Sequence, residues 1–492
     1  MAVTESAGTT AGRGTEGTRA TSGDGDGRDG AGARPAHEGV PRRPPSREPA
    51  ARTYAHALPV VPVRARGLTI EGADGRRYLD CSSGAGTLAL GHNHPVVLEA
   101  IRGALDSGAP LHAPDLATPV RDAFTTELLR TLPPALADHA RVRFCGPTGA
   151  DAVATALELV RAATGRTGLL AFTGAPHGTA RAVLEAAGDA DRARVAWLPY
   201  PQDHRCPFGV GGERGAELGA RLTESLLDDT GPGTPRPAGM ILEPVQGEGG
   251  VVPAPDGWLR RMREITAARA IPLIVDEART GVGRTGRFWA VEHSGVVPDV
   301  MVLSRAIGGS LPLAVVVHHE DLDAWQPGRH ASAFRGNQLA MAAGTATLAH
   351  IRENRLAERA GELGARMLGL LRGLRQEYAC VGDVRGRGLM IGVELVRPED
   401  PPIGSGPRPA APGLAAAVRE ECLRRGLIVD VGGRRAAVVR LLPPLTLTDE
   451  QADAVLDRLA DAVAAVARER PDPHRVPDEG TEPLRTTPGG PS

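Results

Sequence analysis

Short apolar runs alternate with helical patterns of apolar and polar positions between residues 150 and 317. Helical spacing covers Ala150–Ala163 and Trp258–Arg269. The apolar runs are Gly168–Phe172, Met240–Leu242, Pro272–Val275, Val300–Leu303 and Leu313–Val317. Turn or helix signals flank each run, which is typical of buried strands separated by helices. The pattern therefore predicts an α/β domain built on a mostly parallel sheet.

The pattern changes at about Asn337, where longer helical stretches begin. Two helices, two strand-like runs and a terminal helix are predicted at Asn337–Ile351, Leu356–Arg375, Leu389–Val396, Ala436–Leu442 and Asp449–Val466. Residues 403–409 are rich in glycine and proline and predict an exposed loop. This part of the chain predicts a second, smaller α+β domain.

Both ends of the chain lack the apolar residues that a folded segment needs. Residues 1–50 contain ten glycines, and their large apolar residues are Met1, Val3 and Val40. Residues 470–492 contain six prolines and three glycines. Such segments bury too little surface to offset the entropy lost on ordering, so we expect two disordered tails.

Charge and composition exclude several classes of function. The 57 basic and 59 acidic residues leave a formal net charge of -2, so no global field favours nucleic acid or an anionic membrane. No run reaches the roughly 18 apolar residues of a membrane span, and the N-terminus lacks the apolar core of a signal peptide. Five scattered cysteines without a C-x-x-C pair fit a reduced, cytoplasmic protein and give no zinc site.

The chain of 492 residues contains no lysine, so every one of its 57 basic residues is an arginine. A GC-rich genome enriches arginine, alanine, glycine and proline, and codon bias explains part of this composition. The chemical consequence is independent of the cause, because no side chain of this protein can form a lysine imine.

Two segments carry side chains that suit a ligand site. Phe144–Asp151 places small residues and the Thr148 hydroxyl just before a predicted helix, where free N–H groups and the helix dipole favour an anion. An ordinary helix cap is the alternative. Asp276 ends a buried strand, the edge at which α/β proteins bind ligands. A strand-end cap is the alternative there.

Three further motifs are less specific. Glu243–Gly250 follows a strand and carries two carboxylates, which suit either acid–base chemistry or a structural loop. Gly281–Gly286 matches G-x-G-x-x-G, but it does not join a strand directly to a helix, so a turn is the better interpretation. His92 and His94 lie in a predicted rigid turn before the helix Val96–Leu105, and they are too few for a metal site.

Taken in order, these segments resemble the class III, fold type I, pyridoxal-phosphate aminotransferases, and most of all the diaminobutyrate–2-oxoglutarate aminotransferases. The resemblance extends from about Arg52 to Ala467. Its most specific parts are Phe144–Asp151, Ile241–Gly250, Asp276–Gly286, Leu311–Val317, Phe334–Gly344, Val384–Glu394 and Arg440–Leu445. It implies an N-terminal segment of the small domain at 51–110, a large cofactor-type domain at 111–336, and interdomain helices with the C-terminal small domain at 337–469.

The resemblance also implies which residues of the family's site are retained. Asp276 matches the aspartate that pairs with the pyridine nitrogen and keeps the cofactor ring an electron sink. Thr148 and Gly149 match the phosphate cradle. Glu243 matches a glutamate on the substrate side, and Arg440 matches an arginine that binds the substrate α-carboxylate.

Four positions around the cofactor depart from the family pattern. Arg305 stands where the family has its Schiff-base lysine, and Pro176 stands where it has an aromatic residue stacked on the ring. Arg279 replaces a glutamine that contacts the ring hydroxyl, and Ala333 replaces a threonine that reaches the phosphate from the partner subunit. Three of these changes do not replace a lysine, so codon bias against lysine does not explain them.

Two hypotheses describe the altered pocket. In the first, Arg305 pairs with Asp276 and replaces the cofactor. The reason is that an unpaired buried carboxylate lowers the stability of the fold by several kcal/mol, about 3 to 5. In the second, Arg305, Arg279 and Arg440 form a cationic pocket for a small anion: a dicarboxylate, a phosphorylated metabolite or non-covalently held pyridoxamine phosphate.

Three functions remain open at this stage. The chain is a degenerate aminotransferase with a ligand-binding or partner role, an enzyme repurposed for specialised metabolism without a lysine imine, or a residual diaminobutyrate–2-oxoglutarate transaminase. Arginine, with a pKa above about 12, is neither nucleophile nor base, so standard transamination is not expected. The resemblance implies a homodimer, with the loop Ser83–Gly86 near the site at the dimer interface. No nucleic-acid, membrane or metal partner is expected.

Overall fold

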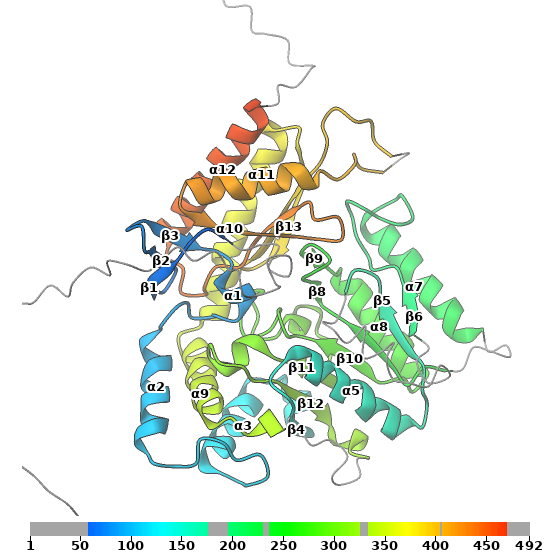
Figure 1. The fold of residues 1–492 in the computed structure, drawn as a ribbon. Helices are drawn as coiled ribbons and strands as arrows, with labels where there is room; N and C mark the ends of the chain where they lie inside the picture. The colour runs from blue at the N-terminus through cyan, green and yellow to red at the C-terminus, as the bar shows by residue number, and fades with distance from the viewer. Residues whose placement is uncertain (1–57, 176–194, 230–235, 325–332, 404–405, 470–492) are drawn as a thin grey trace, which may run out of the picture. The chain divides into compact units, whose positions relative to one another are not determined.

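A seven-stranded sheet forms the centre of the fold (Figure 1). The computed structural model describes residues 58–175, 195–229, 236–324, 333–403 and 406–469. The strands of the sheet are β4 (Ala140–Phe144), β5 (Leu169–Phe172), β6 (Val195–Leu198), β7 (Gly239–Leu242), β10 (Leu273–Asp276), β11 (Val300–Leu303) and β12 (Val315–His319). Their order is β4-β12-β11-β10-β7-β5-β6. The mostly parallel α/β sheet expected from the sequence is thereby confirmed.

The register of this sheet has one reversal. Strand β12 runs antiparallel to both of its neighbours, β11 and β4, whereas the pairs from β11 to β6 are parallel. Every residue of β5, β7, β10 and β11 is buried, because helices cover both faces of a sheet of this kind. The parallel strands therefore end at one common edge.

Only some of the helices around the sheet lie within a few residues of predicted helices. Helix α5 (Gly149–Thr164) packs against β11 and β12 and ends at Gly165, whose φ of 67° is the left-handed C-cap that favours glycine. The other helices of this part are α2 (Pro95–Asp106), α3 (Pro119–Thr131), α4 (Pro134–Ala137), α7 (Gly212–Asp228), α8 (Asp256–Ala268) and α9 (Gln338–Glu353). Of these, α2, α5, α8 and α9 match predicted helices, whereas α3, α4 and α7 were not predicted. Helix α9 contacts both α2 and α3.

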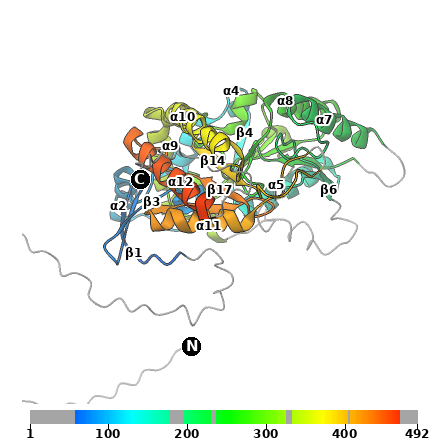
Figure 2. The same ribbon diagram turned by 90° about the horizontal axis from the view of Figure 1, so that it is seen from above.

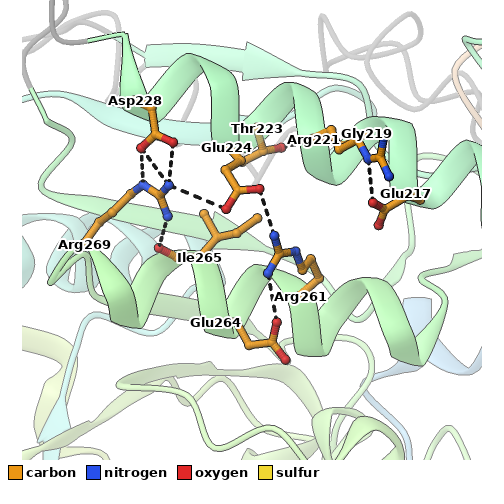
Figure 3. Close-up of polar contacts among 10 residues, drawn as sticks. All are labelled: Glu217, Gly219, Arg221, Thr223, Glu224, Asp228, Arg261, Glu264, Ile265 and Arg269. Carbon is orange, nitrogen blue, oxygen red and sulfur yellow. Dashed lines mark hydrogen bonds and ion pairs between the residues drawn. The ribbon is translucent and has the colours of Figure 1, made fainter.

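Helices α7 and α8 are joined by a surface network of arginines and carboxylates (Figure 3). Arg269, just after α8, pairs with Asp228 through two guanidinium nitrogens. Arg261 lies between Glu224 at 2.8 Å and Glu264 at 3.1 Å. These contacts lie at the solvent-exposed rim of the helix pair, above an apolar interface.

The C-terminal part carries an antiparallel sheet of four strands and three long helices. The strands are β13 (Val381–Arg387), β14 (Met390–Leu395), β17 (Val438–Leu441) and β16 (Asp430–Gly432), in that order. The helices are α10 (Leu356–Glu377), α11 (Pro412–Arg424) and α12 (Asp449–Glu469). Helices α11 and α12 lie side by side in both views (Figure 1, Figure 2).

Two smaller sheets connect distant parts of the chain. Strands β1 (Pro62–Arg66), β2 (Thr69–Gly72) and β3 (Arg77–Asp80) form an antiparallel sheet, to which β15 (Leu427–Ile428) adds in parallel. The N-terminal strands thus join the C-terminal part. Strands β8 (Val245–Gln246) and β9 (Val252–Pro253) form a hairpin between the seven-stranded sheet and β13 (Figure 1).

The turns expected from sequence are present. Residues 278–285 form consecutive turns, as predicted for the G-x-G-x-x-G segment. Gly286 has a φ of 97° and lies against Gly361, so that a Cβ there would be 2.8 Å from the Gly361 Cα. His94 caps α2, and His92 pairs with Asp80 at 2.8 Å. The predicted tails and residues 404–405 of the predicted loop lie outside the described residues.

Candidate functional site

A cavity of about 450 Å³ opens at the carboxyl ends of β10 and β11, where parallel α/β sheets bind their ligands. The N-terminus of α5, the β8–β9 hairpin and the segment 310–313 enclose it. Six of the residues singled out in the sequence line this cavity: Thr148, Gly149, Glu243, Asp276, Arg279 and Arg305. The fold therefore brings these six residues together from four separate segments of the chain.

The N-terminus of α5 forms one end of the cavity. Thr148 is the N-cap, and its hydroxyl accepts a hydrogen bond from the N–H of Asp151, whose carboxylate in turn accepts from the N–H of Thr148. This capping box fixes the first turn. Gly149 and Ala150 are the first helical residues, whose N–H groups have no partner within a helix. The helix-cap interpretation is confirmed, and the anion site stays a prediction, for which this helix end places N–H donors at the cavity.

Asp276 lies opposite this helix end as the last residue of β10. Its side chain is buried, and Oδ1 accepts a hydrogen bond of 3.1 Å from the N–H of Ala278. A Cβ added at Gly149 would be 3.7 Å from the side chains of both Ala278 and Ser304, so the helix end and the two strand ends are in close contact. The carboxylate is thereby held at the floor of the cavity.

Arg305 follows β11 as the first residue of the short 3₁₀ helix η3 (Arg305–Gly308). Its φ of 57° is left-handed, which costs a non-glycine residue on the order of 1 kcal/mol. Burial, together with the charge of Arg279, lowers its pKa to about 10, although the charges of Glu248 and Asp276 act in the opposite direction. The arginine is therefore a largely desolvated cation inside the cavity.

The ion pair expected between Arg305 and Asp276 is wrong for this structure. Within the described residues, the Nη1 group of Arg305 donates to the main-chain carbonyl of Ala85 at 3.0 Å. The left-handed backbone of Arg305 sends the guanidinium across to the turn α1 (Ser83–Gly86) instead of back to β10. In that turn Gly84 and Ala85 also have left-handed backbones, with φ of 59° and 56°.

A second polar network links the hairpin to the four-stranded sheet. Both Arg279 and Arg440 contact the carboxylate of Glu248, and Nη1 of Arg440 lies 3.1 Å from Oε2. Arg440 also pairs with Asp430, its neighbour on the adjacent strand. Burial raises the pKa of Glu248, but the two guanidinium charges outweigh it and hold the pKa below its usual value.

Glycines make room for these arginines. A Cβ at Gly247 would be 2.7 Å from the Cδ of Arg279, and a Cβ at Gly432 would be 2.5 Å from the Cζ of Arg440. Arg440 is 7% exposed and donates also to the carbonyl of Gly247 at 3.3 Å. Both side chains consequently lie flat against backbone, and neither has space to swing freely.

Glu243 lies at the base of the hairpin. It is buried, and Oε1 accepts a hydrogen bond of 3.3 Å from the N–H of Gly247. The buried Tyr200 donates to the carbonyl of Glu243 at 2.7 Å, which fixes this backbone from below. Of the two carboxylates noted in the sequence segment 243–250, one is thus held by backbone and the other by arginines.

Some predicted site residues are not brought to the cavity. Arg440 reaches it only through Glu248, and Ala333 begins the exposed 3₁₀ helix η5 (Ala333–Gly336), where its carbonyl contacts His112. Pro176 lies outside the described residues. The sequence reasoning missed the role of Glu248 as the bridge between two arginines, and it missed Asp430 altogether. No alternating pattern marks this pair, because every residue of β17 is buried and the strand reads as a continuous run interrupted only by Arg440.

Two features are absent from the described residues. No group of histidine, cysteine, aspartate and glutamate side chains there has an arrangement that could hold a metal ion. No helix in these parts of the chain is long and apolar enough to cross a membrane.

Comparison with known proteins gives consistent matches over most of the chain. The family model described as aminotransferase class-III matches residues 50–463. A diaminobutyrate–2-oxoglutarate aminotransferase of Rhizobium meliloti is 50% identical over 430 residues, which cover 86% of this chain and 92% of the relative. Its counterpart in Haemophilus influenzae is 43% identical over 420 residues, covering 84% and 92%.

Solved structures agree with this match. An amine transaminase from an uncultivated Pseudomonas species, in a form with pyridoxal phosphate bound as an internal aldimine, has a TM-score of 0.74 at 30% identity, covering 86% of this chain and 98% of the other. The ornithine aminotransferase of Toxoplasma gondii has a TM-score of 0.69 at 26% identity, covering 85% and 94%. The chain therefore belongs to the class III aminotransferase family and has the fold type I architecture of pyridoxal-phosphate aminotransferases.

Proposed function

We propose that this protein is a diaminobutyrate–2-oxoglutarate aminotransferase homologue that has lost lysine-dependent transamination and binds its ligand without a covalent bond. The observation that carries this proposal is the combination of a lysine-free chain with an arginine, Arg305, in the cavity. The identity to named diaminobutyrate aminotransferases supports the ancestry. The composition of the cavity supports the change of chemistry.

Arginine cannot take over the work of a Schiff-base lysine. A lysine forms an imine and moves protons because its neutral amine is accessible once burial lowers its pKa. Burial lowers the pKa of Arg305 to about 10, so the guanidinium still carries its proton at neutral pH. Its Nη1 is moreover committed to the Ala85 carbonyl. Arg305 therefore contributes charge and position and takes no part in proton transfer.

The cavity residues fit a phosphorylated pyridine in part. The first N–H groups of α5 suit its phosphate, and the Asp276 carboxylate suits a protonated ring nitrogen. The amine that would bind an aldehyde is missing. A ligand that brings its own amine, such as pyridoxamine phosphate, needs no lysine, and the carboxylates of Glu243 and Glu248 in the lining favour its positive charge.

Within such a complex each residue has a limited task. The N-terminus of α5 binds and orients the phosphate, and Asp276 holds a proton on the ring nitrogen. Arg279 and Glu248 are already paired with each other and narrow the side of the cavity next to the hairpin. The cofactor, when bound, supplies an electron sink for chemistry at an amine-bearing carbon. No step that needs a lysine base is available to this chain.

The proposal extends to the assembly. We propose a homodimer, as the family resemblance implies, in which the cavity lies near the partner subunit. The exposed apolar side chains Leu111, Leu116 and Phe334, close to Ala333, support it, because exposed apolar residues that cluster on one surface are typical of an interface. A division into a large domain at 111–336 and a small domain at 337–469 remains part of this proposal.

The test is a titration of the purified protein with pyridoxal phosphate and pyridoxamine phosphate by calorimetry, with absorption spectra recorded in parallel. We expect pyridoxamine phosphate to bind more tightly, and neither spectrum to show an internal imine. An assay with 2,4-diaminobutyrate and 2-oxoglutarate should give no turnover. Turnover by the unmodified chain would overturn the proposal and establish a residual transaminase.

A variant separates a single lesion from a remodelled site. We expect Arg305→Lys to bind pyridoxal phosphate more tightly than the parent chain but not to recover transamination, because Arg279 still pairs with Glu248. Adding Arg279→Gln to it removes that second obstacle. Full activity in Arg305→Lys alone would show that Arg305 was the sole lesion. Turnover of other substrates by the parent chain would support an enzyme repurposed for different chemistry.

A further inference from the structure

A second cavity of about 740 Å³ is also lined by residues of the β8–β9 hairpin. Five arginines from three segments of the chain line it: Arg205, Arg372, Arg375, Arg385 and Arg387. We call this cavity the arginine groove. Its wall is formed by the segment 201–205, β9 with the residues that follow it, the end of α10, and β13.

Three of these guanidinium groups are fixed in place by neighbouring acceptors. Arg385 donates to the Gly250 carbonyl through Nε and Nη2, at 3.0 and 2.8 Å, and through Nη1 to Glu394 at 2.7 Å. Arg205 pairs with the same Glu394 from the opposite side. Arg387 pairs with Asp256 at 2.8 Å. Arg205 and Arg387 also donate through Nη2, to the carbonyls of Arg408 at 3.2 Å and Ala254 at 3.3 Å. Each guanidinium has five N–H donors, so both arginines keep donors beyond these contacts.

The remaining two arginines bring charge that their surroundings do not balance. Arg372 and Arg375 lie one turn apart on α10, on the same side of the helix. Both are exposed, and neither has a carboxylate within 4.0 Å among the described residues. The lining of the groove thus combines two exposed arginines with three whose guanidinium groups are held by acceptors.

The lining of the groove is positive, whereas that of the first cavity is not. With the carboxylates that pair with its arginines included, the five arginines of the groove face Asp203, Asp383, Glu394 and Asp256, which leaves one positive charge. Burial lowers the pKa of His204, so this lining histidine is neutral at pH 7. Around the first cavity, Arg279, Arg305 and Arg440 face Glu243, Glu248, Asp276 and Asp430, which leaves one negative charge. Of the two sites, the groove therefore attracts an anion more strongly.

We propose that the arginine groove is a binding site for a small polyanion, a phosphate-bearing or polycarboxylate metabolite. Fixed guanidinium forks suit the planar or tetrahedral oxygens of such groups, because two parallel N–H donors match them. Arg372 and Arg375 close over the bound anion from α10. The site is distinct from the cavity at the α5 N-terminus, and it does not depend on the function proposed for that cavity.

The experiment uses inorganic pyrophosphate and citrate as probes of the two ligand chemistries. Each is titrated calorimetrically at low ionic strength into the full chain and into the double variant Arg372→Ala/Arg375→Ala. The matched control is Arg214→Ala/Arg221→Ala, which removes two exposed arginines from α7 and changes the net charge equally. All four positions are on exposed helix surfaces, so both variants should fold, which circular dichroism checks.

We expect pyrophosphate to bind the parent chain and the control alike, and to bind the Arg372→Ala/Arg375→Ala variant roughly tenfold or more weakly, with binding that declines as salt rises. Binding of pyrophosphate alone assigns a phosphate-bearing ligand, and equal binding of citrate assigns polyanions generally. Equal affinity in all three proteins overturns the proposal. Binding that takes place only in the first cavity would give this result, because it does not depend on Arg372 or Arg375. So does the absence of binding by either probe at millimolar concentration.

Discussion

The α7–α8 rim and the cavity use the same chemistry in opposite surroundings. On the rim, Arg261 is 40% exposed and is placed between two glutamates (Figure 3). At the cavity, Arg440 is 7% exposed and is placed between Glu248 and Asp430. Water competes for every charge of the first set, whereas in the second set the arginine is buried and only its carboxylate partners are partly exposed. Similar contacts therefore contribute unequally to stability. The comparison teaches that burial, and not the number of ion pairs, decides which arginines matter.

The largest effect is expected from removing the buried arginine. Arg440→Leu leaves Asp430 without its guanidinium and Glu248 with only Arg279, so the free energy of unfolding should fall by about 3–5 kcal/mol. Urea denaturation measures the change. A loss below about 1 kcal/mol would mean that the cavity network resembles the surface one.

Glu277 is a buried carboxylate that has no arginine partner among the described residues, and its contribution to the free energy of unfolding should fall as the pH rises. Glu277 is buried, and its contacts are with the Thr280 hydroxyl and the N–H of Val291. Burial raises its pKa to about 7. Because the unfolded chain releases this proton at lower pH, the stability that Glu277 contributes is complete below about pH 4.5 and is lost as pH rises through 7.

The measurement is the free energy of unfolding from pH 5 to pH 8 for the parent chain and for Glu277→Gln. The parent should lose on the order of 3 kcal/mol more over this range than the variant, since glutamine does not titrate. Its amide oxygen can still accept from the N–H of Val291, and its amide nitrogen can donate to the Thr280 hydroxyl oxygen. If the free energies of unfolding of the parent chain and of Glu277→Gln change with pH in parallel, the raised pKa of Glu277 is contradicted.

An intermediate effect is expected at Arg279, because its partner Glu248 is partly exposed. Arg279→Gln should lower the free energy of unfolding by about 1 kcal/mol and raise the pKa of Glu248 toward its usual value. Carboxyl NMR titration reads the pKa directly. If the pKa of Glu248 stays unchanged, Arg440 alone sets it.

The smallest effect is expected on the rim itself. Arg261→Ala removes two ion pairs with exposed side chains, and the free energy of unfolding should change by less than about 1 kcal/mol. The same urea series that tests Arg440→Leu includes this variant as its surface counterpart. A loss as large as that of Arg440→Leu would erase the distinction between the two regions.

The fold was largely predictable, because its buried strands are short apolar runs bounded by helices. The reversal of β12 was not, since direction within a sheet leaves no mark on an apolar run such as Val315–Val317. The edge strands β4 and β6 were also missed. Arg141 and Arg143 interrupt the first, and Ala196 and Trp197 of the second are exposed, so neither appears as a continuous apolar run.

The positions of the site residues were predictable where a motif fixes the backbone. The contacts that their side chains make were not. Thr148, Asp276 and Arg305 lie where their motifs indicated. The pairing of Arg305 was wrong, because its left-handed backbone directs the side chain to Ala85, and no residue pattern records that angle. Glu248 contacts both Arg279 and Arg440 because Gly247 and Gly432, which have no Cβ, leave space for the two guanidinium groups. That space depends on how separate strands pack against each other, which the sequence does not show.

Residues of the β8–β9 hairpin line both the cavity and the groove, so we expect ligands in the two sites to change each other's affinity. On one side Glu248 accepts from Arg279 and Arg440, and two residues later the Gly250 carbonyl accepts from Arg385. An anion that draws Arg385 away from Gly250 alters the backbone that carries Glu248, and so alters the affinity of the cavity. Reciprocity then requires a cavity ligand to change the affinity of the groove by the same factor. Titrating each site with the other saturated measures that factor from both directions.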